Sequence, residues 1–77
     1  MNMDNEPLRT LRFLLARLER ISADSVTAHR ASGVRGAMLR VLDRLERKLP
    51  VSDAELRFLF EGGYALLNRA AEEKLKH

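Results

Sequence analysis

Apolar residues recur every three or four positions through the first third of the chain. They are Leu8, Leu11, Leu14, Leu15, Leu18 and Ile21. At about 100° per residue these side chains fall on one side of a helix, and the arginines of the same segment fall on the other. The pattern predicts an amphipathic helix over 6–21, preceded by a frayed segment over 1–5.

A second stretch of helical periodicity follows a polar turn and predicts a helix over 24–49. Its apolar stripe consists of Thr27, Ala31, Val34, Met38, Val41, Leu42, Leu45 and Leu49. Gly33 and Gly36 lie within this stretch, and each costs about 1 kcal/mol of helix stability relative to alanine. Either the helix kinks at Gly33, or it is continuous and carries two glycines for a packing reason. We favour the continuous helix.

The third predicted helix begins at a clear local signal. Pro50 ends the preceding helix, and Ser52 to Glu55 form a capping box. In this motif the serine hydroxyl and the glutamate carboxylate each accept a hydrogen bond from the other residue's backbone N–H. The positions that follow predict a helix over 53–75, whose core face holds Leu56, Leu59, Phe60, Gly63, Leu67 and Ala70.

Three amphipathic helices joined by short connections predict an all-α fold, a small antiparallel three-helix bundle that forms a single domain over 1–77. A chain of 77 residues has little core material, since a domain this small buries only about 60% of its unfolded surface. We therefore expect a second chain to complete the bundle by oligomerisation. The alternative is a pair of long helices and a shorter third, again completed by a second chain.

Composition narrows the class of protein. The chain has no cysteine, so it forms no disulfide and no thiolate metal site, as is typical of a reducing compartment. Its longest apolar run, from Phe13 to Ala16, is far shorter than a membrane span. The N-terminus lacks the basic and apolar segments of a signal peptide. We expect a cytoplasmic protein without membrane contact.

Catalytic chemistry has little support in the sequence. His29 and His77 lie far apart, so they cannot build a closed zinc site. Ser25 and Ser32 lie within one helical turn of His29. Asp24, the acid that would have to orient this histidine, projects about 140° away from it on a helix. We expect a protein that is not an enzyme, with no cofactor and no bound metal.

The second predicted helix also carries small residues on the side away from its apolar stripe. They recur every three or four positions and end in a leucine: Ser25, Ala28, Ser32, Gly36 and Leu39. Small side chains at this spacing let another backbone approach closely. We interpret this small-residue stripe as a contact for a helix of the same chain or of a second copy. The alternative is ordinary solvent exposure.

Three large apolar residues fall outside the predicted core: Phe13, Leu39 and Phe58. Single exposed hydrophobic residues are normal, but two of the three phenylalanines lie off the core of a chain that is short of core material. We predict that a second subunit buries Phe58 and Leu39. For Phe13 the same prediction competes with local cover by arginine side chains through a cation–π contact.

The chain is basic, with a net charge of +3, and the excess lies on the second predicted helix. A basic arc of about 100° on this helix holds His29, Arg30, Arg40, Arg44, Arg47 and Lys48. Guanidinium groups suit phosphates and carboxylates, which makes the arc a candidate for binding an anionic partner. The other interpretation is a solvated face neutralised by Asp43 and Glu46. Single-stranded nucleic acid is disfavoured, because the arc has no aromatic residue.

Together these patterns predict a helical protein–protein interaction module, either a homo-oligomer or a non-catalytic subunit or adaptor of a larger complex. The alternative is a basic nucleic-acid-associated protein that binds phosphates through the arginines of the second helix. No motif in the chain points to a known family.

Overall fold

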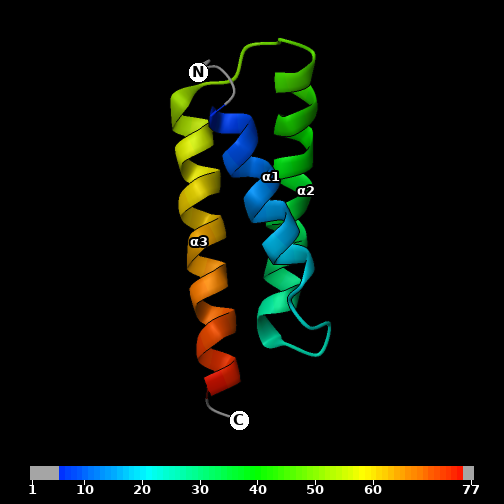
Figure 1. Cartoon of the computed structure of the whole chain (residues 1–77), viewed down its shortest axis with the longest axis vertical. Helices are drawn as coiled ribbons and strands as arrows, with labels where there is room; N and C mark the ends of the chain where they lie inside the picture. Colours follow the sequence, from blue (N-terminus) through cyan, green and yellow to red (C-terminus); the bar gives the residue numbers. More distant parts are fainter. Residues whose placement is uncertain (1–5, 76–77) are drawn as a thin grey trace.

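The computed structural model describes residues 6–75 and consists of three helices. α1 spans Glu6–Glu19, α2 spans Val26–Glu46 and α3 spans Asp53–Leu75. Successive helices run in opposite directions, so α2 is antiparallel to both of its neighbours (Figure 1). The described part of the chain is therefore the all-α three-helix bundle that the sequence predicts. The fraying predicted for 1–5 lies outside the described residues.

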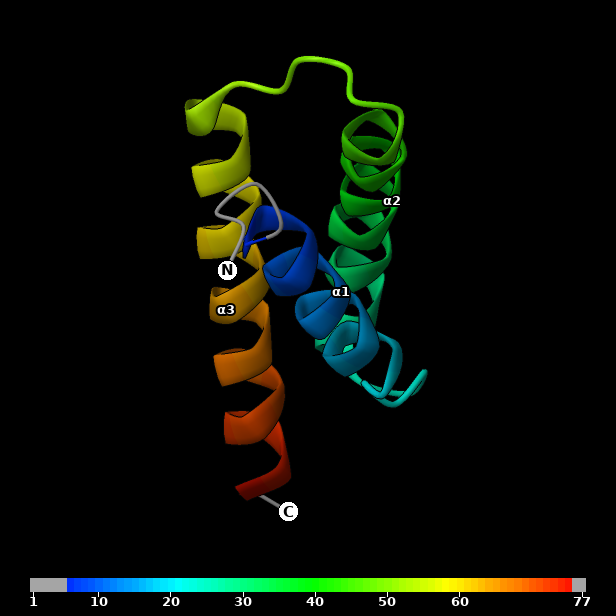
Figure 2. The same cartoon turned by 45° about the horizontal axis from the view of Figure 1, so that its top comes forward.

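α1 crosses one face of the α2–α3 pair obliquely. It begins beside α3 and ends beside the start of α2 (Figures 1 and 2). All three pairs of helices are nevertheless in contact. Among residues 6–75, no element covers the opposite face of the α2–α3 pair (Figure 2). The two sides of this pair are consequently very different, one packed against α1 and one open.

The core centres on the point where all three helices meet. Leu11 and Leu14 of α1 and Met38 of α2 are fully buried. Opposite them on α3 lies Gly63, where an added Cβ would be 2.8 Å from Met38 Cε and 3.2 Å from Leu14 Cδ1. Because Gly63 has no side chain, α1 and α2 both send side chains against the α3 backbone.

The core face of α3 is turned slightly from the predicted one. Leu56, Leu59, Gly63 and Leu66 are buried, whereas Phe60, Leu67 and Ala70 are half-buried. The rotation follows from the position of α1, which leaves the side of α3 that carries Leu67 and Ala70 partly uncovered.

α2 is continuous through both of its glycines, as predicted. Neither glycine is explained by packing within the described residues. A Cβ at Gly33 would have no neighbour within 4 Å, and a Cβ at Gly36 would have Arg40 Nη1 at 3.8 Å. The close helix approach in this bundle occurs at Gly63 instead.

The connection between α1 and α2 is longer than predicted, because α1 ends at Glu19 and α2 begins at Val26. Ser25 is the N-cap of α2, and its side chain accepts a hydrogen bond from the backbone N–H of Thr27 at 3.0 Å. A serine in extended backbone conformation at this position is the usual start of a helix. The polar turn residues therefore end one helix and begin the next.

α2 ends at Glu46, before the predicted end at 49, and Pro50 is not what ends it. Lys48 adopts a left-handed backbone with φ of 61°. The N–H of Leu49 then donates to the carbonyl of Arg44 at 2.8 Å, and the N–H of Lys48 donates to the carbonyl of Leu45 at 3.0 Å. This is the Schellman pattern, which is usually built on glycine.

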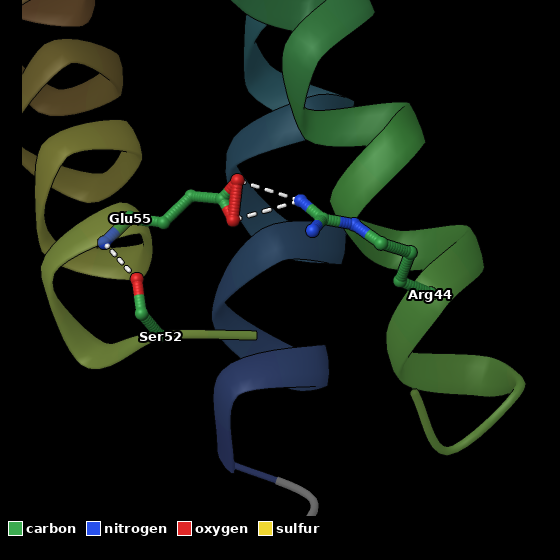
Figure 3. Close-up of polar contacts among 3 residues, drawn as sticks. All are labelled: Arg44, Ser52 and Glu55. Carbon is green, nitrogen blue, oxygen red and sulfur yellow. Dashed lines mark hydrogen bonds and ion pairs between the residues drawn. The ribbon is translucent and has the colours of Figure 1, made fainter. Parts of the chain in front are cut away.

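One half of the predicted capping box forms at the start of α3. Ser52 Oγ accepts a hydrogen bond from the backbone N–H of Glu55 at 3.1 Å. The Glu55 carboxylate, however, accepts two hydrogen bonds from Arg44 Nη2 on α2, at 2.6 and 2.7 Å (Figure 3). A hydrogen bond to a guanidinium is stronger than one to a neutral N–H. The carboxylate therefore joins α3 to α2 instead of capping its own helix.

Candidate partner-binding surfaces

The large apolar side chains that the sequence places outside the core are exposed. Phe13 on α1 is 47% exposed, Leu39 on α2 is 49% exposed and Phe58 on α3 is 76% exposed. Arg17 Cζ lies 5.3 Å from the centre of the Phe13 ring, a cation–π contact. This contact supports one of the two expectations for Phe13, that arginine side chains cover its ring. Phe58 is the most exposed of the three.

The small-residue stripe of α2 lies in two environments. Its first member, Ser25, caps the helix. Ala28 and Ser32 line a shallow hollow of about 270 Å³ together with residues at the end of α1, so these small side chains face the same chain. Gly36 and Leu39 lie beyond this hollow, and Leu39 is exposed. Ser32 is exposed as well and Gly36 is half-buried, so the stripe from Ser32 to Leu39 remains open to a partner.

Two arginines of the basic arc are paired within the chain. Arg44 is bound to Glu55 of α3, and each side chain is 37% exposed. Arg47 Nε lies 3.4 Å from Asp43 Oδ2 one turn away on α2, an exposed pair. Asp43 was expected to neutralise part of the arc, and it does so for Arg47. Arg44 faces α3 and is occupied there.

The rest of the basic arc is exposed. Arg30, Arg40 and Lys48 have no carboxylate partner among residues 6–75. Glu46, also expected to neutralise the arc, pairs with Arg12 of α1, with 2.9 Å between Arg12 Nη2 and Glu46 Oε2. Glu46 projects from the side of α2 that faces α1, which is why it does not neutralise the arginines of the arc.

A polar cluster that the sequence pattern does not predict joins the start of α2 to the end of α3. The Glu73 carboxylate accepts hydrogen bonds from the hydroxyls of Ser25 and Thr27 and from the backbone N–H of Thr27. Thr27 is 3% exposed, so this member of the apolar stripe is buried in polar contacts. Ser25 and Glu73 are 48 positions apart, and no local pattern in the sequence connects them.

A hollow of about 500 Å³, the α1–α3 groove, lies between the end of α1 and the last turns of α3. Ile21 supplies apolar lining beside α1, and α3 supplies a strip formed by Leu67, Ala70 and Ala71. The cationic side chains that line it are Arg17, Arg20 and Lys74. The periodicity of α3 predicts Leu67 and Ala70 in the core, because it does not reveal that α1 diverges from α3.

The described part of the chain shows neither a metal-binding cluster nor a membrane-spanning helix. Residues 6–75 contain no group of three or more histidine, aspartate or glutamate side chains that could hold a metal ion. Within the same range, every helix is too short or too polar to cross a membrane. The chain matches no family model, no curated protein and no solved structure.

Proposed function

We propose that this chain is a small helical protein–protein interaction module, acting as a homo-oligomer or as a non-catalytic subunit or adaptor of a larger complex. The observation that carries the proposal is the 76% exposure of Phe58 on a bundle with little core. Burial of such a side chain contributes about 1.5–3 kcal/mol. A domain of this size gains proportionally more from that burial than a large one.

The surroundings of Phe58 support a contact with another helix. Gly62 and Ala65 follow at helical spacing, so they share its side of α3. A Cβ at Gly62 would have no neighbour within 4 Å. A large aromatic ring beside a stretch of small side chains forms a surface against which a partner helix can pack.

Phosphate binding through the basic arc is the alternative function and has weaker support. Arg44 and Arg47 are already paired with carboxylates. Arg30, Arg40 and Lys48 remain without a carboxylate partner among residues 6–75, fewer than the roughly six to ten phosphate contacts that make DNA binding steeply salt-dependent. A cytoplasmic location belongs to the main proposal, because a chain that relies on no disulfide suits a reducing compartment.

The proposal is tested at position 58. We expect a photo-crosslinking residue in place of Phe58 to give an adduct of higher mass in cells, with either a second copy or another protein. Tyr64 is the matched control, since it lies on α3 and is 47% exposed but projects from a different side. A monomer by light scattering, combined with no adduct at position 58, would refute the module. Tight, salt-steep binding of a short DNA duplex would favour the alternative.

A further inference from the structure

We propose that the α1–α3 groove binds a short acidic amphipathic helix of a partner protein. This inference rests on the proposed interaction function and adds to it a site and a partner chemistry. The site is separate from Phe58, which does not line the groove.

The groove exists because α1 and α3 differ in length. α1 has 14 residues and α3 has 23. The two helices meet where Leu14 packs against Gly63. Beyond this contact α1 continues for about one and a half turns, whereas α3 continues for more than three. The last turns of α3 therefore lack a neighbouring helix on the side where α1 would otherwise lie.

The lining on α3 has the periodicity of a helix contact. Leu67, Ala70, Ala71 and Lys74 are spaced by three, one and three residues, so they form one strip along α3. The alanines let another backbone approach closely, and Leu67 and Ile21 offer apolar surface. A helix that lays its apolar face into such a groove is a recurrent mode of peptide recognition.

The charges around the groove select an acidic helix. Arg20 and Lys74 have no carboxylate partner among residues 6–75, and Arg17 lies over the Phe13 ring. Asp24 and Glu73 also line the groove, so three cationic side chains face two acidic ones and the lining stays net positive. The Glu73 carboxylate is held at the α2 end by Ser25 and Thr27. A second copy of this chain, with its net charge of +3, is a poorer match than an acidic partner.

The test uses the full chain and two fluorescein-labelled probe peptides. Each peptide is about three turns long with leucines on one face; one carries glutamates on the other face, and its control carries lysines. We expect saturable binding of the acidic peptide by fluorescence anisotropy, weakened by salt. Charge reversal in the Arg20→Glu, Lys74→Glu double variant should lower the affinity about tenfold or more.

A second pair of variants separates the groove from general effects. Ala71→Gln narrows the groove and should abolish binding, whereas Ala16→Gln, at an exposed position of α1 outside the groove, should not. Thermal melting confirms that both variants fold. Equal binding of the two peptides, binding of neither, or binding unaffected by Ala71→Gln would overturn the inference. So would loss of self-association in Ala71→Gln, because the occupant would then be a second copy.

The two proposals can fail independently. An adduct at position 58 without acidic-peptide binding would leave the interaction module in place and overturn the groove as its site. Absence of both would overturn both.

Discussion

The backbone N–H of Thr27, in the first turn of α2, donates a hydrogen bond to Glu73 Oε1 near the end of α3 at 3.1 Å. The hydroxyls of Ser25 and Thr27 donate to the same carboxylate. A negative charge at a helix N-terminus is favoured by the helix dipole and satisfies an N–H that has no partner within the helix. The end of one helix thus caps the beginning of another.

We predict that Glu73→Gln, which keeps the shape of the side chain but removes its charge, lowers the free energy of unfolding by about 1–2 kcal/mol. Urea denaturation followed by circular dichroism measures the change. The control is Glu72→Gln, the exposed neighbour, which should change stability by less than about 0.5 kcal/mol. Equal effects of the two variants would show that the cap does not stabilise the bundle.

A second prediction concerns the adjacent glycines of α3. A Cβ at Gly63 meets Leu14 Cδ1 at 3.2 Å as well as the end of Met38, whereas a Cβ at Gly62 meets nothing within 4 Å. Leu14 and Met38 are both fully buried, so close packing opposes the displacement of either side chain. We expect Gly63→Ala to destabilise the protein by about 1 kcal/mol or more, despite the higher helix propensity of alanine.

The neighbouring variant Gly62→Ala should instead stabilise the protein by up to about 1 kcal/mol, because it gains helix propensity without a clash. Thermal unfolding of both variants under the same conditions provides the comparison. Similar melting temperatures would contradict the close packing at Gly63.

A third prediction concerns the end of α2. Lys48 has a φ of 61°, a conformation that costs a residue with a Cβ about 1–2 kcal/mol and that glycine adopts freely. We expect Lys48→Gly to raise the free energy of unfolding by about 1 kcal/mol. Lys48→Ala removes the charge but keeps the strain, so it should give no such gain. Chemical denaturation of both variants distinguishes relief of strain from loss of charge.

A fourth prediction compares two ion pairs. Arg44 and Glu55 are each 37% exposed, whereas Arg12 and Glu46 are 59% and 51% exposed. Double-mutant cycles should give a coupling of about 1 kcal/mol for the first pair and about 0.5 kcal/mol or less for the second, because solvent screens exposed charges. Equal couplings would mean that the Arg44–Glu55 pair is screened by solvent as fully as the more exposed pair.

The spacing of apolar residues was sufficient to predict the three helices. The leucines of α1 and the core positions Met38 and Gly63 fall where the 3.6-residue period places them. The period also correctly excluded Phe13, Leu39 and Phe58 from the core. These features depend on neighbours within one or two turns, which a sequence pattern records directly.

Features that depend on the angle between helices could not be predicted in this way. The Glu55 carboxylate binds Arg44 of α2 and does not cap its own helix at Ser52. Glu73 likewise binds the start of α2. Both contacts join residues that are far apart in the sequence. The α1–α3 groove follows from the oblique crossing of α1 (Figure 1). The left-handed backbone of Lys48 could not be predicted either, because Pro50 is by itself a sufficient signal in the sequence for the end of the helix.

The two polar contacts between α2 and α3 have a joint consequence for how these helices are aligned. Arg44 meets Glu55 near one end of the pair, and Thr27 meets Glu73 near the other. Sliding one helix along the other by one turn, about 5.4 Å, would still place apolar side chains against apolar side chains. It would break both polar contacts at once. The apolar surface therefore holds the two helices together, and these two glutamates, with the contact of Met38 at Gly63, select a single register.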